Sequence, residues 1–493
     1  MAKIKAGWAE VSITPDKRIS LSGQFFERIS EYVETEITVT ALAIESDGEQ
    51  VVFCSCDLVG VDDDLIKEVR ERVSKKSSGI DAEKIILNAT HTHTSHTYKG
   101  GVSTLSSAKD ILNSFLPEDK KYVAKVETEI ENYMKETEAF EFLAERISSA
   151  ILLAWENRKE AKFACGFGRA AVGMCRRVSY DDGTTKMWGD SNSANFTALE
   201  GGNDSGIELI YFFDENEKLT GVVANIACPS QVVEHRSFIS SDYWGKVKIF
   251  LREKFGDDLF VLGLCSPAGD QCPRDLIRWV NPETPIDDPN IERKTYIERT
   301  ADPSMFDIKG TIKVGKRIAN EIISVFEEIE KKEDSAELVH KVLKVNLPLR
   351  RVTKTQYEEA VAELKKYAAE AKGNVNFADN AMMHVHSGTV ARFELQEKQN
   401  IKPIEMHVLK FGNVAFATNP FELFLDYGNQ MRARSRARQT FLIQLCCGSD
   451  GYLPTKKAEE GGHYSAYVSS GTVGHEGGDL LVRTTLEEIN SMF

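Results

Sequence analysis

The sequence has few of the features that mark a secreted or membrane-bound protein. Its 493 residues include nine cysteines, an odd number, widely scattered and without paired Cys-x-x-Cys spacing, which predicts reduced thiols and no disulfides. No apolar run approaches the length of a membrane-spanning helix. The N-terminus enters a strand-like pattern without the apolar stretch of a signal peptide, so we expect a cytoplasmic protein with no membrane anchor.

An excess of positive charge is also missing. Lys and Arg number 61 against 76 Asp and Glu, which gives a formal net charge of −15 and a pI near 5.3. A surface this acidic repels phosphate backbones and anionic lipid, so we expect a small-molecule substrate and no nucleic-acid partner. Internal repeats and low-complexity tracts are absent as well, whereas 42% hydrophobic residues are ample for large cores.

The chain contains a regular alternation of strand-like and helix-like segments. Apolar segments at residues 37–45 and 50–60 flank an Asp-Gly turn at 47–48 and predict a hairpin. An amphipathic helix over 63–74 and a strand over 85–89 follow, which is the strand–helix–strand unit of a mixed or parallel sheet. We therefore predict an α/β fold with a mixed β-sheet core and surrounding helices.

The rest of the chain continues this pattern, and we interpret residues 1–493 as a single catalytic unit. Further strands are predicted at residues 163–173, 206–213, 222–227, 259–264, 404–411 and 414–418, and helices at 312–332 and 355–372. Residues 105–160 predict a charged helical excursion, solvated between 118 and 138. Residues 275–310 are rich in Pro, Asp and Arg without clear periodicity, which predicts a long surface loop and makes it a candidate lid.

The strongest chemical signal lies between residues 85 and 101, where three of the ten histidines fall within six residues. His91 and His93 follow an apolar strand two positions apart. In an extended backbone alternate side chains share a face, so both imidazoles point the same way. Two converging imidazoles are a start for a metal site, and His96 lies close enough to join or assist them. The alternative is a polar loop whose histidines bond only one another and water.

Five further clusters of ligand-type or catalytic side chains follow apolar strands, a common place for sites in α/β sheets. They are residues 227–231, 239–245, 265–274, 419–424 and 449–455. Singly, each is a weak signal, because a Glu after Pro is usually a helix N-terminal charge and a Tyr after Gly usually packs in a turn.

Taken together, these motifs resemble the neutral ceramidases and their bacterial relatives, over nearly the whole chain and in the same order. The matching segments are residues 6–15 (Ala-Gly-Trp-Ala-Glu-Val-Ser-Ile-Thr-Pro), 89–93 (Ala-Thr-His-Thr-His), 239–245, 268–273 and 451–455 (Gly-Tyr-Leu-Pro-Thr). Thr94-Ser95-His96 departs from the Ser-Gly-Pro of that family. The resemblance implies the ceramidase catalytic fold, with no room for the C-terminal immunoglobulin-like domain of the large ceramidases.

The resemblance also implies a zinc site with one ion per chain. His91, Glu422 and Tyr452 fall at ligand positions of the family, and Cys228 aligns with its second zinc-binding histidine. Cysteine is a competent zinc ligand, so Cys228 preserves the site in this interpretation. Two alternatives stay open, namely that His235, seven residues on, takes that place or that the metal is lost.

The catalytic groups are implied in the same way. His93 is expected to shuttle protons and Arg176, in the Met-Cys-Arg-Arg segment, to stabilise a developing oxyanion. Cys272 aligns with a serine once assigned as the nucleophile of that family. Asp242 and Asp270 are expected to support the site by orienting ligands and loop backbone.

These features predict a zinc-dependent hydrolase of an amide or ester bond, in which the metal activates water and polarises the carbonyl. The acidic surface, the missing anchor and the polar candidate lid favour a small soluble substrate over long-chain ceramide. Three other classes remain open: a thiol hydrolase using Cys272 or Cys228, a non-catalytic ligand-binding relative, and a metal-dependent lyase or isomerase acting on carbohydrate.

Overall fold

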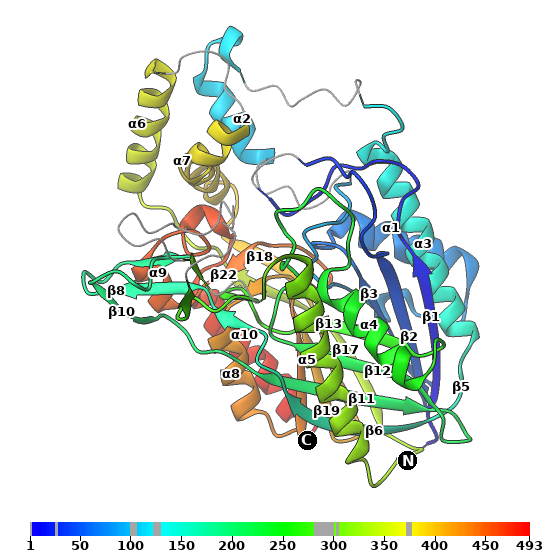
Figure 1. The fold of residues 1–493 in the computed structure, drawn as a ribbon. Coiled ribbons are helices and arrows are strands. Elements are labelled where there is room, and N and C mark those ends of the chain that lie inside the picture. Colours follow the sequence, from blue (N-terminus) through cyan, green and yellow to red (C-terminus); the bar gives the residue numbers. More distant parts are fainter. Residues whose placement is uncertain are drawn as a thin grey trace.

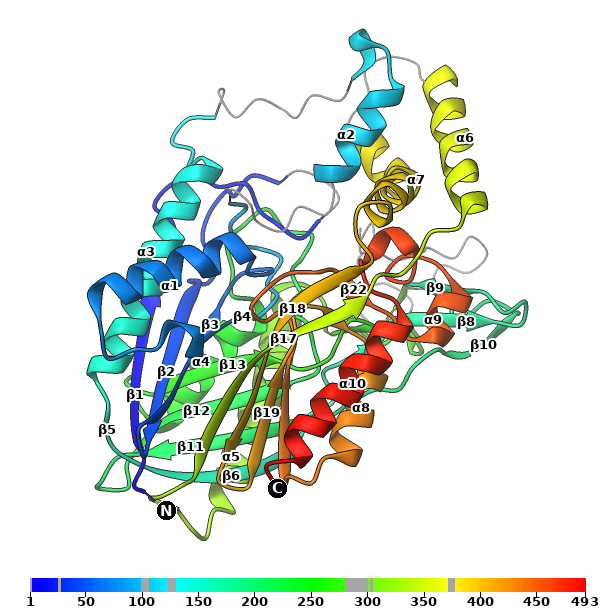
Figure 2. The ribbon, with the colours of Figure 1, turned by 180° about the vertical axis from the view of Figure 1, so that it is seen from behind.

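The computed structural model describes residues 2–24, 28–98, 106–121, 130–280, 300–301, 305–370 and 377–493. Within these residues, three larger β-sheets lie at the centre and helices cover their outer faces (Figures 1 and 2). The predicted α/β fold with a mixed sheet core is confirmed.

The first sheet contains the predicted hairpin and the strand that leads to His91. Its order is β4-β3-β2-β1-β5, with β1 at Lys5–Ser12, β2 at Thr38–Ser46, β3 at Glu49–Cys56, β4 at Ile85–Ala89 and β5 at Lys159–Glu160. The turn between β2 and β3 has positive φ at Asp47 (52°) and Gly48 (79°), as a tight hairpin requires. Helix α1, Asp63–Lys76, then returns the chain so that β4 pairs parallel to β3.

The same unit of hairpin, helix and parallel strand recurs in the other two large sheets, although the sequence shows no internal repeat. The second unit consists of β11 (Gly206–Phe213), β12 (Leu219–Ile226), α4 (Asp242–Phe255) and β13 (Phe260–Cys265). The third consists of β18 (Ile401–Phe411), β19 (Val414–Thr418), α8 (Leu425–Arg434) and β21 (Gln439–Ile443). β6 (Lys162–Arg169) completes the second sheet and β17 (Leu338–Pro348) the third.

Alternate residues on the central strands face two different apolar cores. On β11, Ile210 and Phe212 belong to a core shared with the first and third sheets. Leu209 and Tyr211, on the opposite face, pack in the core of helices α4 and α5 (Asp307–Glu327). This is the period of two expected of a strand buried on both faces. Helices cover the outer faces of the other two large sheets as well: α3 (Glu136–Glu156) packs on the first sheet and α10 (His475–Asn490) on the third (Figure 1).

Three helices form a separate cluster that stands above the sheets in Figure 1: α2 (Ser106–Phe115), α6 (Lys354–Glu370) and α7 (Phe377–Gln396).

The excursion predicted over residues 105–160 is helical in α2 and α3. Both helices pack against other parts of the protein, because each carries an apolar stripe, with Leu112 on α2 and Ile147 on α3 fully buried. Between them, the described residues hold only the short turn Glu118–Lys120, and residues 122–129 lie outside the described part.

The remaining short strands form small ladders near the ends of the large sheets. They are β7 (Met174–Cys175), β8 (Arg177–Tyr180), β9 (Thr185–Met187), β10 (Phe196–Leu199), β14 (Gln271–Cys272), β20 (Glu422–Leu423) and β22 (Tyr452–Leu453), and the short helix α9 spans Lys456–Gly461. Of the candidate lid, β15 (Trp279–Val280) pairs with β16 (Thr300–Ala301). Residues 281–299 and 302–304 lie outside the described part, so the lid prediction is untested.

The free edge of β4 is joined to the segment that follows β21. The backbone N–H of Ala89 donates to Leu445 O at 3.2 Å, and that of Cys447 donates to Leu87 O at 2.9 Å. Asn88 and Cys446 form a bridge between these two bonds. This seam ties the strand that precedes His91 to the chain that leads toward Tyr452.

Two further observations concern the helices and the thiols. No described helix is both long and apolar enough to cross a membrane. All nine cysteines lie in the described part of the chain and are free thiols, and only Cys165 is exposed.

Candidate active site

His91 is the residue from which the site is built. It follows the fully buried strand β4, and its φ of 67° lies in the left-handed region, which non-glycine residues adopt at an energetic cost. Its Nδ1–H donates to the carbonyl oxygen of Val59 at 2.6 Å. Because a carbonyl only accepts, this bond assigns the proton to Nδ1 and leaves a lone pair on Nε2.

His93 lies across from that lone pair. Its Nε2 is 3.3 Å from Nε2 of His91, and the two rings are nearly perpendicular. Its Nδ1 lies 3.3 Å from Oε2 of Glu234. The sequence correctly predicts that the two imidazoles converge, but the reason differs: the chain turns sharply at His91, whereas the prediction assumed an extended backbone.

Burial and nearby positive charge hold the pKa of His93 well below its usual range, so the ring is neutral near neutral pH. The ring also leaves no room beside the backbone of Gly23. A Cβ there would lie 2.6 Å from Cγ of His93, and the φ of Gly23 is +97°, so only glycine fits this position.

Glu422 and Tyr452 are brought side by side by a two-residue parallel ladder, in which β20 pairs with β22 and Glu422 lies opposite Tyr452. Oε2 of Glu422 lies 3.4 Å from Nε2 of His91. Burial alone would raise the pKa of Glu422, but His91, Arg176 and the hydrogen bond from Tyr452 outweigh it, so the pKa is lowered. Glu422 is thus a carboxylate aimed at His91.

Arg176 closes the site on the side of Tyr452. It is buried, and its Nη2 donates to the Tyr452 hydroxyl at 3.2 Å and to Gly269 O at 3.0 Å, while Nη1 reaches Oε1 of Gln231 at 3.4 Å. We call the group His91, His93, Arg176, Glu234, Glu422 and Tyr452 the His91 cluster.

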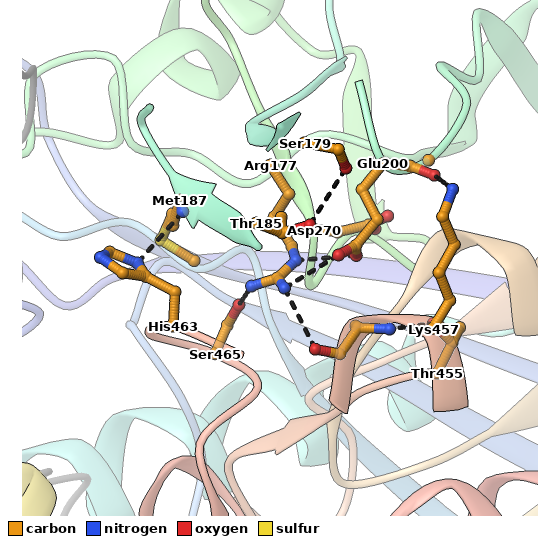
Figure 3. A network of polar contacts seen from close by, with 12 residues as sticks. Arg177, Ser179, Thr185, Met187, Glu200, Asp270, Thr455, Lys457, His463 and Ser465 are labelled. Carbon is orange, nitrogen blue, oxygen red and sulfur yellow. Dashed lines mark hydrogen bonds and ion pairs between the residues drawn. The ribbon is translucent and has the colours of Figure 1, made fainter. Parts of the chain in front are cut away.

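The neighbouring arginine, Arg177, has a different role. Arg177 is the first residue of β8 and makes a buried ion pair with both carboxylate oxygens of Glu200, at 2.8 and 2.9 Å. It also donates to Gly462 O and Ser465 Oγ, so the pair clamps residues 458–465 onto β8 (Figure 3). The ring of Tyr464, in this clamped segment, packs edge-on against Tyr452.

The predicted supporting aspartates hold loop backbone. The Asp242 carboxylate accepts from the N–H groups of Val233 and Tyr243, and burial raises its pKa to about 7. Oδ1 of Asp270 accepts from the N–H of Leu425, and its carbonyl accepts from the N–H of Arg176. Asp270 therefore positions the backbone of Arg176.

The other two predicted histidines lie outside the His91 cluster. His96 is fully buried, with Nε2 at 2.8 Å from Ile13 O, which is a structural contact. The ring of His235 stacks on Phe306 with centroids 4.5 Å apart. The structure therefore brings neither ring into contact with His91.

The two predicted cysteines are buried and turned toward backbone carbonyls. Sγ of Cys228 faces Val172 O at 3.5 Å and Pro229 O at 3.7 Å, and Sγ of Cys272 faces Arg274 O at 3.4 Å. Burial raises the pKa of Cys272 to about 12 and that of Cys228 well above its usual range. The structure does not bring Cys228 into a compact group with His91 and Glu422.

The His91 cluster nevertheless fits a metal ion through three donors. With bonds of about 2.0–2.2 Å at tetrahedral angles, two ligand atoms lie roughly 3.3–3.6 Å apart. The 3.4 Å between His91 Nε2 and Glu422 Oε2 matches this separation, and Tyr452 lies opposite Glu422 in the β20–β22 ladder. A separate group, Glu405, His407 and Cys447, is the only one in the described part of the chain with three or more His, Cys, Asp or Glu donor atoms all within 4.8 Å of one another.

Sequence reasoning missed two charged residues beside the site. Glu234 is buried next to His93, and burial raises its pKa against the opposing charges of Arg274, Arg176 and Arg28. Arg28 donates to the carbonyl oxygen of His93 at 2.7 Å and to that of Ser22 at 2.6 Å. An acid after two valines was the only signal for Glu234, and nothing in the sequence around Arg28 marks it.

Solved structures of ceramidases share this fold. The neutral ceramidase from Pseudomonas aeruginosa matches all of this chain and 75% of its own chain, with a TM-score of 0.66 at 15% sequence identity. A ceramidase complexed with C2 matches with the same TM-score and coverage at 13% identity. No protein-family model matches the chain, and no curated protein sequence does. The fold is therefore neutral-ceramidase-like, as the motifs predicted.

Proposed function

We propose that this neutral-ceramidase-like chain is a metal-dependent hydrolase that cleaves an amide or ester bond of a small, polar substrate. The observation that carries the proposal is the convergence of His91 Nε2, Glu422 Oε2 and the Tyr452 hydroxyl beside His93 and Arg176. These residue types serve hydrolysis through a bound cation, a proton carrier and an oxyanion partner.

Zinc is the proposed ion, one at this site, held by His91, Glu422 and Tyr452. When bound, it supplies a Lewis acid that activates water near neutral pH. Each of these residues is fixed by its own contact: His91 by Val59 O, and Glu422 and Tyr452 by the β20–β22 ladder. The fourth position predicted for Cys228 would require its thiol to turn away from Val172 O.

The protein's own groups would move the proton and hold the charge. His93, neutral because it is buried, accepts a proton at Nε2, the nitrogen that faces His91. Glu234, 3.3 Å from Nδ1, stabilises the ring once it is charged. Arg176, fixed by Gly269 O, directs positive charge at the Tyr452 hydroxyl and at an oxygen that becomes negative beside it.

The surroundings of the cluster support a polar substrate. Arg28, Arg176 and Arg274 are buried around Glu234, so that three guanidinium groups face two carboxyl groups in the site. Long alkyl chains need an apolar trough, whereas charged and amide side chains suit a small molecule with anionic or hydroxyl groups. We therefore expect poor activity on long-chain ceramide.

The test is hydrolysis by the zinc-loaded protein of small N-acyl and ester compounds, compared with short-chain and long-chain N-acyl sphingosines in detergent. A kcat/KM of about 10⁴ M⁻¹s⁻¹ or more on a small compound would support the proposal. Efficient cleavage of long-chain ceramide would overturn the substrate class. No hydrolysis of any compound by protein shown to contain zinc would overturn the reaction.

A further inference from the structure

A second group of donor atoms lies where β18 of the third sheet meets the seam between β4 and the segment after β21. It consists of Glu405 and His407 on β18 and Cys447 in the segment after β21. One nitrogen, one oxygen and one sulfur donor lie within 4.8 Å of one another. We call these three residues, with Arg70 and His340 beside them, the Cys447 cluster.

Glu405 and His407 share a face because they are two positions apart on one strand. Oε1 of Glu405 is 2.8 Å from Nε2 of His407. The backbone of His407 is fixed in turn, since its N–H donates to the Thr418 hydroxyl at 2.9 Å. Two of the three donors are therefore placed by the sheet itself.

A relay of two rings fixes which nitrogen of His407 faces the group. Nδ1–H of His340 donates to Gln50 O at 3.1 Å, so Nε2 of His340 must accept. The atom it accepts from is Nδ1 of His407, at 2.9 Å, which therefore carries a proton. The remaining nitrogen, Nε2, points at Glu405. A histidine that donates through one nitrogen and faces a donor set with the other is arranged as metal-ligating histidines are.

The backbone of Cys447 is held in a strained conformation beside this group. Its φ of 50° is in the left-handed region, and its N–H is fixed by Leu87 O at 2.9 Å. Its side chain lines a surface cavity of about 840 Å³, together with Glu405, Arg70, Lys402 and Pro420. The cavity therefore borders the donor group on the side of Glu405 and Cys447.

Arg70 orients the carboxylate and balances charge. Its guanidinium donates to Oε2 of Glu405 at 2.9 Å and to Oε1 at 2.6 Å, and it lies 3.8 Å from Sγ of Cys447. A divalent ion bound by a thiolate, a carboxylate and a neutral imidazole leaves a net charge of zero on the three-ligand centre. Arg70 holds the carboxylate from outside that centre, as the groups around metal ligands do.

We propose that Glu405, His407 and Cys447 bind a thiophilic divalent cation, such as zinc, at a second site independent of the His91 cluster. The cation would replace the proton between His407 Nε2 and Glu405 Oε1, and these atoms, 2.8 Å apart in the structure, would separate to roughly 3.3–3.6 Å. The mixed sulfur, nitrogen and oxygen donor set suits Zn²⁺ or Co²⁺ rather than Mg²⁺ or Ca²⁺, which prefer oxygen alone. The cavity provides an open fourth position.

The test uses the full chain, stripped with a chelator and titrated with Co²⁺. Cobalt bound to a thiolate gives a sulfur-to-metal charge-transfer band, and X-ray absorption of the zinc form should show one sulfur at about 2.3 Å. Wild-type protein and the His91→Ala and Cys228→Ser variants should all show the band. Cys447→Ser should lose it and His407→Ala should bind about 100-fold more weakly or worse, whereas Cys446→Ser, the adjacent cysteine, should keep it.

A second measurement on wild-type protein covers variants that fail to fold. Zinc should slow alkylation of Cys447 by iodoacetamide at least tenfold, as read by peptide mapping, and should leave Cys165 unchanged. A band that survives Cys447→Ser, or alkylation of Cys447 at the same rate with and without zinc, would overturn the proposal. A band lost in Cys228→Ser instead would assign the thiolate ligand to the His91 cluster.

Discussion

The His91 cluster and the Cys447 cluster contain similar side chains, but they are assembled differently. In the His91 cluster, the residues come from segments far apart in the sequence. His91 and Arg176 lie on loops, while the short β20–β22 ladder places Glu422 beside Tyr452. In the Cys447 cluster, two of three donors are alternate residues of one strand. Loops permit a sharp turn such as that at His91, whereas a strand sets side chains at fixed spacing.

The arginines show the same difference. Arg70 binds both carboxylate oxygens of Glu405, whereas Arg176 donates to Tyr452 and Gly269 O and leaves Glu422 to face His91. The thiols differ as well. Burial raises the pKa of Cys272 to about 12, while a hydrogen bond with Cys446 and the charges of His407 and Arg70 lower that of Cys447 to about 5 against the effect of burial. This difference fits the two proposals, a reaction site built mainly from loops and short ladders and a ligand site built mainly on one long strand.

The largest expected effect is the loss of activity on removing His91, with metal binding at the Cys447 cluster retained. His91→Ala should lower kcat/KM for the small-molecule substrate on the order of 10³-fold or more, because it removes a proposed metal ligand and the partner of His93. The cobalt–thiolate band at the Cys447 cluster should remain in this variant. His386→Ala, on the separate helix α7, is the matched control and should keep full activity. Unchanged activity in His91→Ala would remove the His91 cluster from the mechanism.

The second prediction concerns the ion pair behind the His91 cluster. Glu200→Gln should lower the free energy of unfolding by about 3–5 kcal/mol, because it leaves the Arg177 guanidinium buried without its counter-charge. Urea denaturation would measure the change. Glu460→Gln, in the exposed pair with Lys456, should change stability by less than about 0.5 kcal/mol. Equal stability of the two variants would show that the clamp contributes nothing.

The third prediction concerns how the stability of the fold depends on pH, at a carboxylate away from both clusters. Glu10 on β1 binds Lys248 and Arg252, each at 2.8 Å, which lowers its pKa from 4.5 to about 2 against the effect of burial. A lowered folded pKa stabilises the protein above pH 4.5, and that stabilisation is lost as the pH falls toward 2.

At neutral pH the lowered pKa of Glu10 contributes about 3 kcal/mol to the free energy of unfolding, because one pKa unit corresponds to about 1.36 kcal/mol. Glu10→Gln should therefore be less stable than wild type at pH 7, and the difference should shrink between pH 4.5 and 2. Denaturant unfolding at a series of pH values measures this. A difference that does not vary with pH would contradict the assignment, and Glu160→Gln, from an exposed pair with Lys3, is the control.

The smallest effect concerns the orientation of a ligand. His340→Phe keeps a ring of similar size but removes the acceptor for Nδ1–H of His407, so cobalt affinity at the Cys447 cluster should fall about 10–100-fold. Metal binding at the His91 cluster should not change. Competition with a chromophoric chelator measures the dissociation constant of the metal at each cluster. An unchanged affinity at the Cys447 cluster would show that the ring relay does not set the tautomer.

Local signals were sufficient for the hairpin at Asp47–Gly48 and the helix over Asp63–Lys76. Helices α4, α7, α8 and α10 were not predicted, because the sequence motifs around them drew attention to loops or carried no clear apolar period. The sequence also indicated His91, His93, Glu422 and Tyr452, through motifs. It did not predict the orientation of Cys228, since a thiol turns toward either a carbonyl or a ligand set without any change in local pattern.

The charged neighbours and the second cluster could not be found from sequence for a related reason. Arg28 and His93 are 65 positions apart, and His340 and His407 are 67 positions apart. Only the way the sheets pack brings these pairs together. The alternation Glu405-x-His407 is visible in the sequence, but nothing near it shows that Cys447 would come to lie beside it.

The seam along the free edge of β4 has a thermodynamic consequence. The hydrogen bonds of Leu87 and Ala89 to residues 445–447 connect the strand before His91 to the backbone of Cys447. Filling one centre would change the metal affinity of the other only by as much as it displaces this seam, and that factor would be the same in either direction. Calorimetric titration of wild-type protein, His91→Ala and Cys447→Ser with zinc would give that factor as a coupling constant between the two sites.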